Sequence, residues 1–123
     1  MKLDSLRRWL IPLFWAAACF ALVIALLPRP PQLPGAPSDK TQHILAFGVL
    51  TALAVGAYPK VRLLALCAAL SAFGALIELL QAIPRLHRDA SIADWAADTL
   101  AVAVIAGLIA LLRAGDVKRR ARR

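Results

Sequence analysis

Seven of the polar or charged side chains that lie within or beside long apolar stretches of this 123-residue sequence could take part in ligand binding. An ionisable group at the middle of a membrane-spanning helix costs about 2.5–3.5 kcal/mol, and less toward the ends, so each one needs a reason. Lysine, arginine and histidine cations suit phosphate oxygens, whereas imidazole and carboxylates suit proton exchange. The candidate ligand-binding residues are Lys40, His43, Glu78, Gln81, Arg88, Asp94 and Asp98.

The spacing of these residues predicts three helices, each with one polar face. Steps of three or four residues recur, which places successive members on the same side of a helix. Three polar faces in apolar surroundings should face one another, and the small residues among them allow close helix approach. The three series are Ser71, Gly74, Glu78 and Gln81; Ser91, Asp94 and Asp98; and Lys40, His43 and Phe47.

Helix capping is an alternative explanation for some of these residues. Ser38 or Asp39 is placed to cap the second helix. Ser91 followed three residues later by Asp94 resembles a capping box, so capping and ligand binding are equally supported for Asp94. Glu78 and Asp98 lie at no cap, and for these two we favour a functional role or an interhelical polar lock.

Composition indicates that the helices lie in a membrane. The chain is 61% hydrophobic, with a mean hydropathy of +0.70. A soluble domain of this size, about half apolar, could not bury that much apolar surface. Spans of about 20 residues are expected at 9–27, 41–58, 61–83 and 91–112, separated by proline-containing breaks such as Pro28–Pro37. The predicted fold is an all-α membrane protein with four transmembrane helices.

The basic residues predict the orientation of the spans. Eleven of the fifteen lysines and arginines flank one side, including six in the tail 113–123, and the other four flank the opposite side. Both termini (1–8 and 113–123) are therefore expected in the cytoplasm, with the basic tail as a membrane flank and not a nucleic-acid arm. Helical rise then puts Glu78, Asp98 and His43 about 9, 10 and 6 Å deep from the outer face. Trp9, Tyr58 and Trp95 are expected as interfacial anchors.

Three motifs in order resemble the VanZ-like family of small bacterial membrane proteins. They are Asp39-Lys40-x-x-His43, then Glu78-x-x-Gln81, then Arg88-x-x-Ser91-x-x-Asp94-x-x-x-Asp98. The resemblance covers about residues 39–107, and departs where the family often has Asn in place of Asp98 and glycines after it. It implies a place in the bacterial cytoplasmic membrane and cell envelope, and a link to susceptibility to the glycopeptide teicoplanin.

Four functions remain open on the sequence. The first is binding of an anionic headgroup in the outer leaflet, for instance a polyprenyl phosphate or cell-wall lipid. The second, ranked lower, is a membrane-embedded hydrolase or transferase using His43 with carboxylates, either to hold a divalent metal ion or with His43 as general base. No cofactor is expected, and no metal, because neither the two cysteines nor the other candidate ligands have a metal-ligand spacing. A proton-coupled exporter and a structural or partner-assembly protein complete the alternatives; the oligomeric state is left open.

Overall fold

The computed structural model describes residues 2–28, 39–86 and 88–123, and they form four α-helices. The helices are α1 (Lys2–Leu26), α2 (Asp39–Ala57), α3 (Leu63–Gln81) and α4 (Ile92–Ala121), with one 3-10 turn, η1 (Pro84–Leu86), between the last two. The all-helical class with four helices is therefore confirmed. The expected loop of residues 28–37, apart from Pro28, lies outside the described residues, as does the capping role considered for Ser38.

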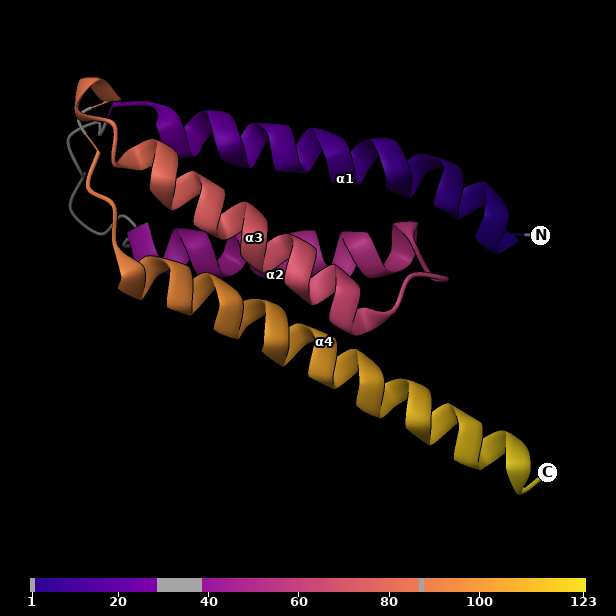
Figure 1. Cartoon of the computed structure of the whole chain (residues 1–123). Helices are drawn as coiled ribbons and strands as arrows, with labels where there is room; N and C mark the ends of the chain where they lie inside the picture. Colours follow the sequence, from indigo (N-terminus) through magenta and orange to yellow (C-terminus); the bar gives the residue numbers. More distant parts are fainter. Residues whose placement is uncertain (1, 29–38, 87) are drawn as a thin grey trace.

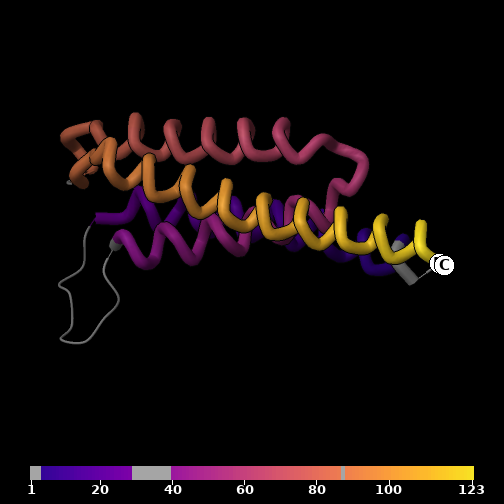
Figure 2. The backbone as a smooth tube through the Cα atoms, turned by 90° about the horizontal axis from the view of Figure 1, so that it is seen from below, coloured from indigo at the N-terminus to yellow at the C-terminus, as the bar shows by residue number. Residues whose placement is uncertain are grey.

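Successive helices run in opposite directions along one bundle (Figures 1 and 2). One end of the bundle holds both chain termini and the turn at residues 58–62, and we call it the terminal end (Figure 1). The other end, where α1 and α3 finish and α2 and α4 begin, we call the distal end. All three polar faces expected from the sequence therefore start or finish at the distal end.

Three of the helices are long and apolar enough to cross a membrane: residues Asp4–Leu26 of α1, Leu63–Gln81 of α3, and α4. Their outward surfaces carry large apolar side chains, such as Leu64, Leu79 and Leu111, that are more than two-thirds exposed. Lipid is the solvent in which such a surface is stable. The chain is therefore a membrane protein. Helix α2 is not among these three, because its first turns carry polar residues such as Lys40 and His43.

The buried core lies where α2, α3 and α4 meet. Phe47 and Leu50 of α2, Ile77 of α3 and Val102 of α4 are each 1–2% exposed. Helix α1 covers this core with partly buried residues, several of them alanines, and it packs mainly against α2. Since lipid is as apolar as leucine, close packing rather than removal of apolar surface from water holds such helices together. Helix α2 is thus the central element that orients the others.

The terminal end is fastened by polar and aromatic contacts between α1 and the end of α2. Arg7 donates from Nε to the carbonyl oxygen of Ala57 at 3.1 Å, which satisfies one of the free carbonyls at the end of α2. Trp15 donates from Nε1 to the Tyr58 hydroxyl at 2.7 Å, and Phe14 packs edge-on against both rings. Tyr58 therefore joins two helices in addition to its expected position near the membrane interface.

Helix α4 is longer than the fourth span expected at 91–112. It continues through the basic residues to Ala121, and its last turns are exposed. Thirty helical residues extend about 45 Å, whereas a bilayer core is about 30 Å thick. The basic tail is thus a helical extension of α4 that projects beyond the turn between α2 and α3, as the start of α1 also does (Figure 1).

Candidate functional site

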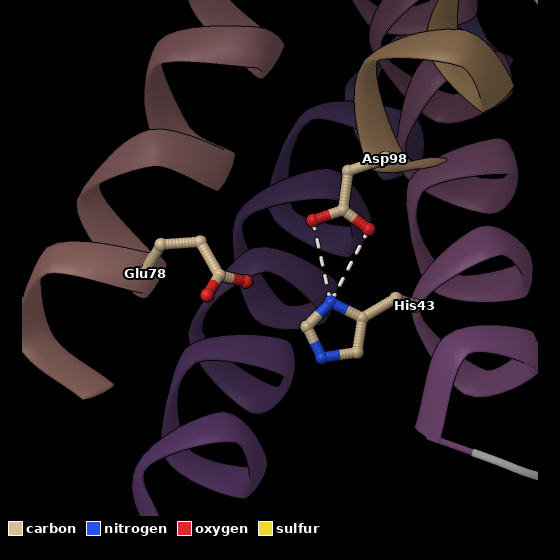
Figure 3. A group of neighbouring side chains, drawn as sticks. All are labelled: His43, Glu78 and Asp98. Carbon is tan, nitrogen blue, oxygen red and sulfur yellow. Dashed lines mark hydrogen bonds and ion pairs between the residues drawn. The ribbon is translucent and has the colours of Figure 1, made fainter. Parts of the chain in front are cut away.

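One side chain from each of α2, α3 and α4 meets the others near the distal end. His43, Glu78 and Asp98 have ligand atoms that all lie within 4.8 Å of one another, and Figure 3 shows the three side chains pointing toward a common centre. His43 Nδ1 lies 3.2 Å from both carboxylate oxygens of Asp98. Asp98 is fully buried, Glu78 is 9% exposed and the His43 side chain is 12% exposed. We call these three residues the polar cluster.

Gly74 makes room for the polar cluster inside the core. A Cβ atom at this position would meet Phe47 Cζ at 3.4 Å and Asp98 Oδ2 at 3.5 Å. The Phe47 ring, which stacks obliquely against Phe73, therefore lies directly over the glycine. Gly74, one of the small residues expected on the polar face of the third helix, thus allows the Phe47 ring and the Asp98 carboxylate to approach the α3 backbone.

The two oxygens of the Glu78 carboxylate have different surroundings. Oε2 accepts the Ser91 backbone N–H at 2.7 Å, whereas Oε1 is buried and has no hydrogen-bond partner among the described residues. Ser91 is the N-cap of α4, and its hydroxyl accepts the Asp94 N–H at 3.3 Å. The first half of the anticipated capping box is therefore present. The carboxylate that takes the N-cap N–H belongs to Glu78 on α3, not to Asp94.

A second set of polar contacts joins α3 to a neighbouring face of α4. The hydroxyls of Ser71 and Thr99 lie 2.8 Å apart, and Trp95 donates from Nε1 to the Ser71 carbonyl oxygen at 3.0 Å. The sequence patterns did not single out Thr99, and they assigned Trp95 to the membrane interface. A step of four through Ser91, Trp95 and Thr99 would have revealed this second face of α4.

Lys40, Arg88 and Asp94 belong to distal-end segments and are not members of the polar cluster. Among the described histidine, cysteine, aspartate and glutamate residues, the group of mutually close ligand atoms consists of His43, Glu78 and Asp98. Lys40 is exposed on the first turn of α2, and Arg88 is half-buried in the segment that leads into α4. Asp94 is half-buried in the first turn of α4, where its charge suits the helix dipole.

Gln81 is buried but faces a different helix. Its side-chain Nε2 donates to the carbonyl oxygen of Ala25 at 2.9 Å, and its exposed fraction is 2%. Ala25 lies in the last turn of α1, where backbone carbonyls have no partner within the helix. Gln81 therefore caps the end of α1 and joins it to α3.

We expect Gln81→Met, which keeps the length of the side chain but removes its donor, to lower the free energy of unfolding by about 0.6–1.7 kcal/mol, the range for hydrogen bonds between membrane helices. Unfolding in mixed detergent micelles, followed by circular dichroism, measures this change. Leu80→Met on the same helix serves as the control and should stay close to the original protein. Equal stability of the two variants would show that the Gln81 contact contributes nothing.

An apolar groove between α3 and α4 reaches the polar cluster from outside. Its volume is about 360 Å³, and Glu78 and Ser91 form its polar part. The remaining lining residues are Ala75, Leu79, Ala82, Ala90, Ile92 and Trp95. Glu78 therefore belongs both to this α3–α4 groove and to the polar cluster.

No family model matches the sequence, and comparisons with curated proteins and with solved structures found no match. The chemistry of the site is therefore argued from its residues.

An imidazole held by a buried carboxylate can act as a general base, so the arrangement satisfies one requirement of the enzyme hypothesis. The same three side chains can hold a cation. Two carboxylates against one imidazole make the polar cluster acidic, which disfavours direct contact with an anion.

Proposed function

We propose that this protein binds an amphiphile with an anionic headgroup, such as a polyprenyl phosphate or a cell-wall lipid, at the distal end of the bundle. The α3–α4 groove carries this proposal. It is lined by apolar side chains that suit a hydrocarbon chain, and its polar part, Glu78 and Ser91, lies next to buried polar groups. Ligand sites commonly combine a mainly apolar lining with a few fixed polar groups in this way.

The proposal includes four membrane spans with both termini in the cytoplasm. Helix α2 lies alongside the other three, and its 19 residues extend about 28 Å, close to the thickness of a bilayer core. Eleven of the fifteen lysines and arginines belong to the sequence segments of the terminal end, and such residues accumulate on the cytoplasmic side. The distal end then faces outward, and the headgroup comes from the outer leaflet.

Lys40 and Arg88 are the proposed contacts for the headgroup. Both belong to distal-end segments, and cationic donors bind phosphate oxygens strongly. The order of three short motifs resembles the VanZ-like family. On that resemblance, the proposal places the protein in the bacterial cell envelope and links it to glycopeptide susceptibility.

Filling the α3–α4 groove tests the proposal. Ala75→Trp places an indole in the groove, and we expect it to reduce labelling by a photoactivatable polyprenyl phosphate at least fivefold, because the hydrocarbon chain loses its space. Labelling is measured in proteoliposomes by mass spectrometry of the crosslinked peptides. The control is Ala69→Trp, which adds the same side chain at an exposed position of α3 outside the groove.

A matched polyprenol probe, which lacks the phosphate, separates headgroup binding from general contact with lipid. The original protein should be labelled more strongly by the phosphate probe than by the polyprenol. Equal labelling by the two probes, or equal labelling of Ala75→Trp and Ala69→Trp, would contradict the proposed function.

A further inference from the structure

We propose that His43, Glu78 and Asp98 form a binding site for one divalent transition-metal ion. The three residues are 35 and 20 positions apart in the sequence, and three different helices bring them together (Figure 3). Each offers a ligand atom, one from an imidazole and two from carboxylates, all within 4.8 Å of one another. The ions Zn²⁺ and Mn²⁺ are the representatives used below.

The separations fit a shared ion. Metal–donor distances of about 2.0–2.2 Å put neighbouring donors about 3 Å apart and opposite donors about 4.2 Å apart. His43 Nδ1 and the Asp98 oxygens, at 3.2 Å, already have the spacing of neighbouring donors. The ligand atoms of the whole set lie within 4.8 Å of one another, which exceeds the opposite-donor distance by about 0.6 Å. Rotation of the flexible Glu78 side chain can remove that difference.

The unpartnered oxygen of Glu78 points independently to a ligand. Oε1 is buried and has no hydrogen-bond partner among the described residues. Glu78 as a whole is only 9% exposed. Figure 3 shows the Glu78 carboxylate directed from α3 toward the His43 ring. A buried acceptor without a hydrogen-bond partner is destabilising, and more so when it is charged. A cation at the centre of the polar cluster would give this oxygen a partner.

The charges and donor types select the kind of ion. Two buried carboxylates need compensation, and a divalent cation supplies two positive charges between them. The imidazole nitrogen favours Zn²⁺ or Fe²⁺ over Ca²⁺ and Mg²⁺, which prefer oxygen ligands throughout, and the two carboxylates also suit Mn²⁺. Outside the three donors, the Ser91 backbone N–H holds the second oxygen of Glu78 at 2.7 Å. Hydrogen bonds of this kind orient metal-binding carboxylates.

The ion would also remove the mismatch between an acidic cluster and an anionic headgroup. Three protein donors leave at least one coordination position open, and a phosphate oxygen can take it. This last step rests on the proposed function, whereas the metal site itself does not. The Glu78 carboxylate belongs to the metal site and also lines the α3–α4 groove, so it connects the metal site to the proposed lipid site.

Equilibrium dialysis of the detergent-purified protein against Zn²⁺ or Mn²⁺, with metal content measured by mass spectrometry, tests the site. We expect one ion per chain, bound about tenfold or more weakly by His43→Ala, Glu78→Gln and Asp98→Asn. Glu78→Gln and Asp98→Asn keep the size of the side chains, and circular dichroism checks that each variant is folded. Electron paramagnetic resonance of bound Mn²⁺ provides a second readout.

Two controls separate the site from adventitious binding. Cys19→Ser with Cys67→Ser removes both thiols, and Asp116→Asn removes an exposed carboxylate from α4; both should bind like the original protein. No binding by the original protein, unchanged binding by the three cluster variants, or loss only with the thiols would overturn the proposal. Labelling by the phosphate probe without any metal binding would overturn the metal site alone. Metal binding without labelling would instead contradict the proposed function.

Discussion

Asp98→Ala is expected to lower the free energy of unfolding by about 3 kcal/mol in the presence of a metal chelator, because it leaves the largely enclosed imidazole of His43 without its partner. Asp98 is fully buried and lies 3.2 Å from His43 Nδ1 through both of its oxygens. Unfolding of the purified protein in mixed detergent micelles, followed by circular dichroism, gives the value. The chelator ensures that loss of a bound ion does not contribute.

Asp98→Asn provides the matched variant for this prediction. An amide has nearly the shape of the carboxylate and keeps an acceptor oxygen for His43, so we expect a loss of only about 1 kcal/mol. His43→Ala combined with Asp98→Ala completes a double-mutant cycle, which isolates the energy of the pair. A single Asp98→Ala variant as stable as the original protein would show that the pair does not hold α2 to α4.

Gly74→Leu is expected to have the second large effect. The leucine would have to occupy space now filled by the Phe47 ring and the Asp98 carboxylate, which lie 3.4 and 3.5 Å from the place that a Cβ atom would take at this position. Overpacking of this kind costs about 1–3 kcal/mol. Displacement of Asp98 should also abolish binding of Zn²⁺. Micelle unfolding and equilibrium dialysis measure the two consequences separately.

Two control substitutions test whether the effect of Gly74→Leu comes from the size of the side chain and from its position. Gly74→Ala adds only a Cβ in ordinary van der Waals contact and should change stability little. Gly107→Leu adds the same large side chain to α4 at a position where a Cβ would meet nothing within 4 Å. If Gly74→Leu unfolds like Gly107→Leu, the close approach of Phe47 and Asp98 to α3 is not a constraint on the fold.

These variants also separate a purely structural polar lock from a binding site. A lock predicts that stability and function fall together in every variant of the polar cluster. Glu78 differs from Asp98 in this respect, because one of its oxygens has a partner and the other has none among the described residues. A Glu78→Gln variant that folds normally and binds neither metal nor probe would therefore favour a binding site.

The sequence by itself determined the helical class, the existence of four helices and the membrane setting. Apolar stretches of about 20 residues, broken by prolines and turns, leave few other ways to satisfy backbone hydrogen bonds in lipid. Steps of three and four residues correctly placed His43, Glu78 and Asp98 on helix faces that meet. Apolar stretches and helical spacing depend on residues close together in the sequence, so both can be predicted from the sequence alone.

Only the tertiary structure decided which of the aligned polar residues belong together. Gln81 shares a helical face with Glu78, yet it turns to the end of α1, because its position one turn later brings it to the Ala25 carbonyl. Asp94 shares a face with Asp98, yet the N-cap N–H goes to Glu78 on another helix. The three residues of the polar cluster, separated by 35 and 20 positions, have no spacing that a sequence motif could record. Their distances follow from how α2, α3 and α4 pack around Gly74.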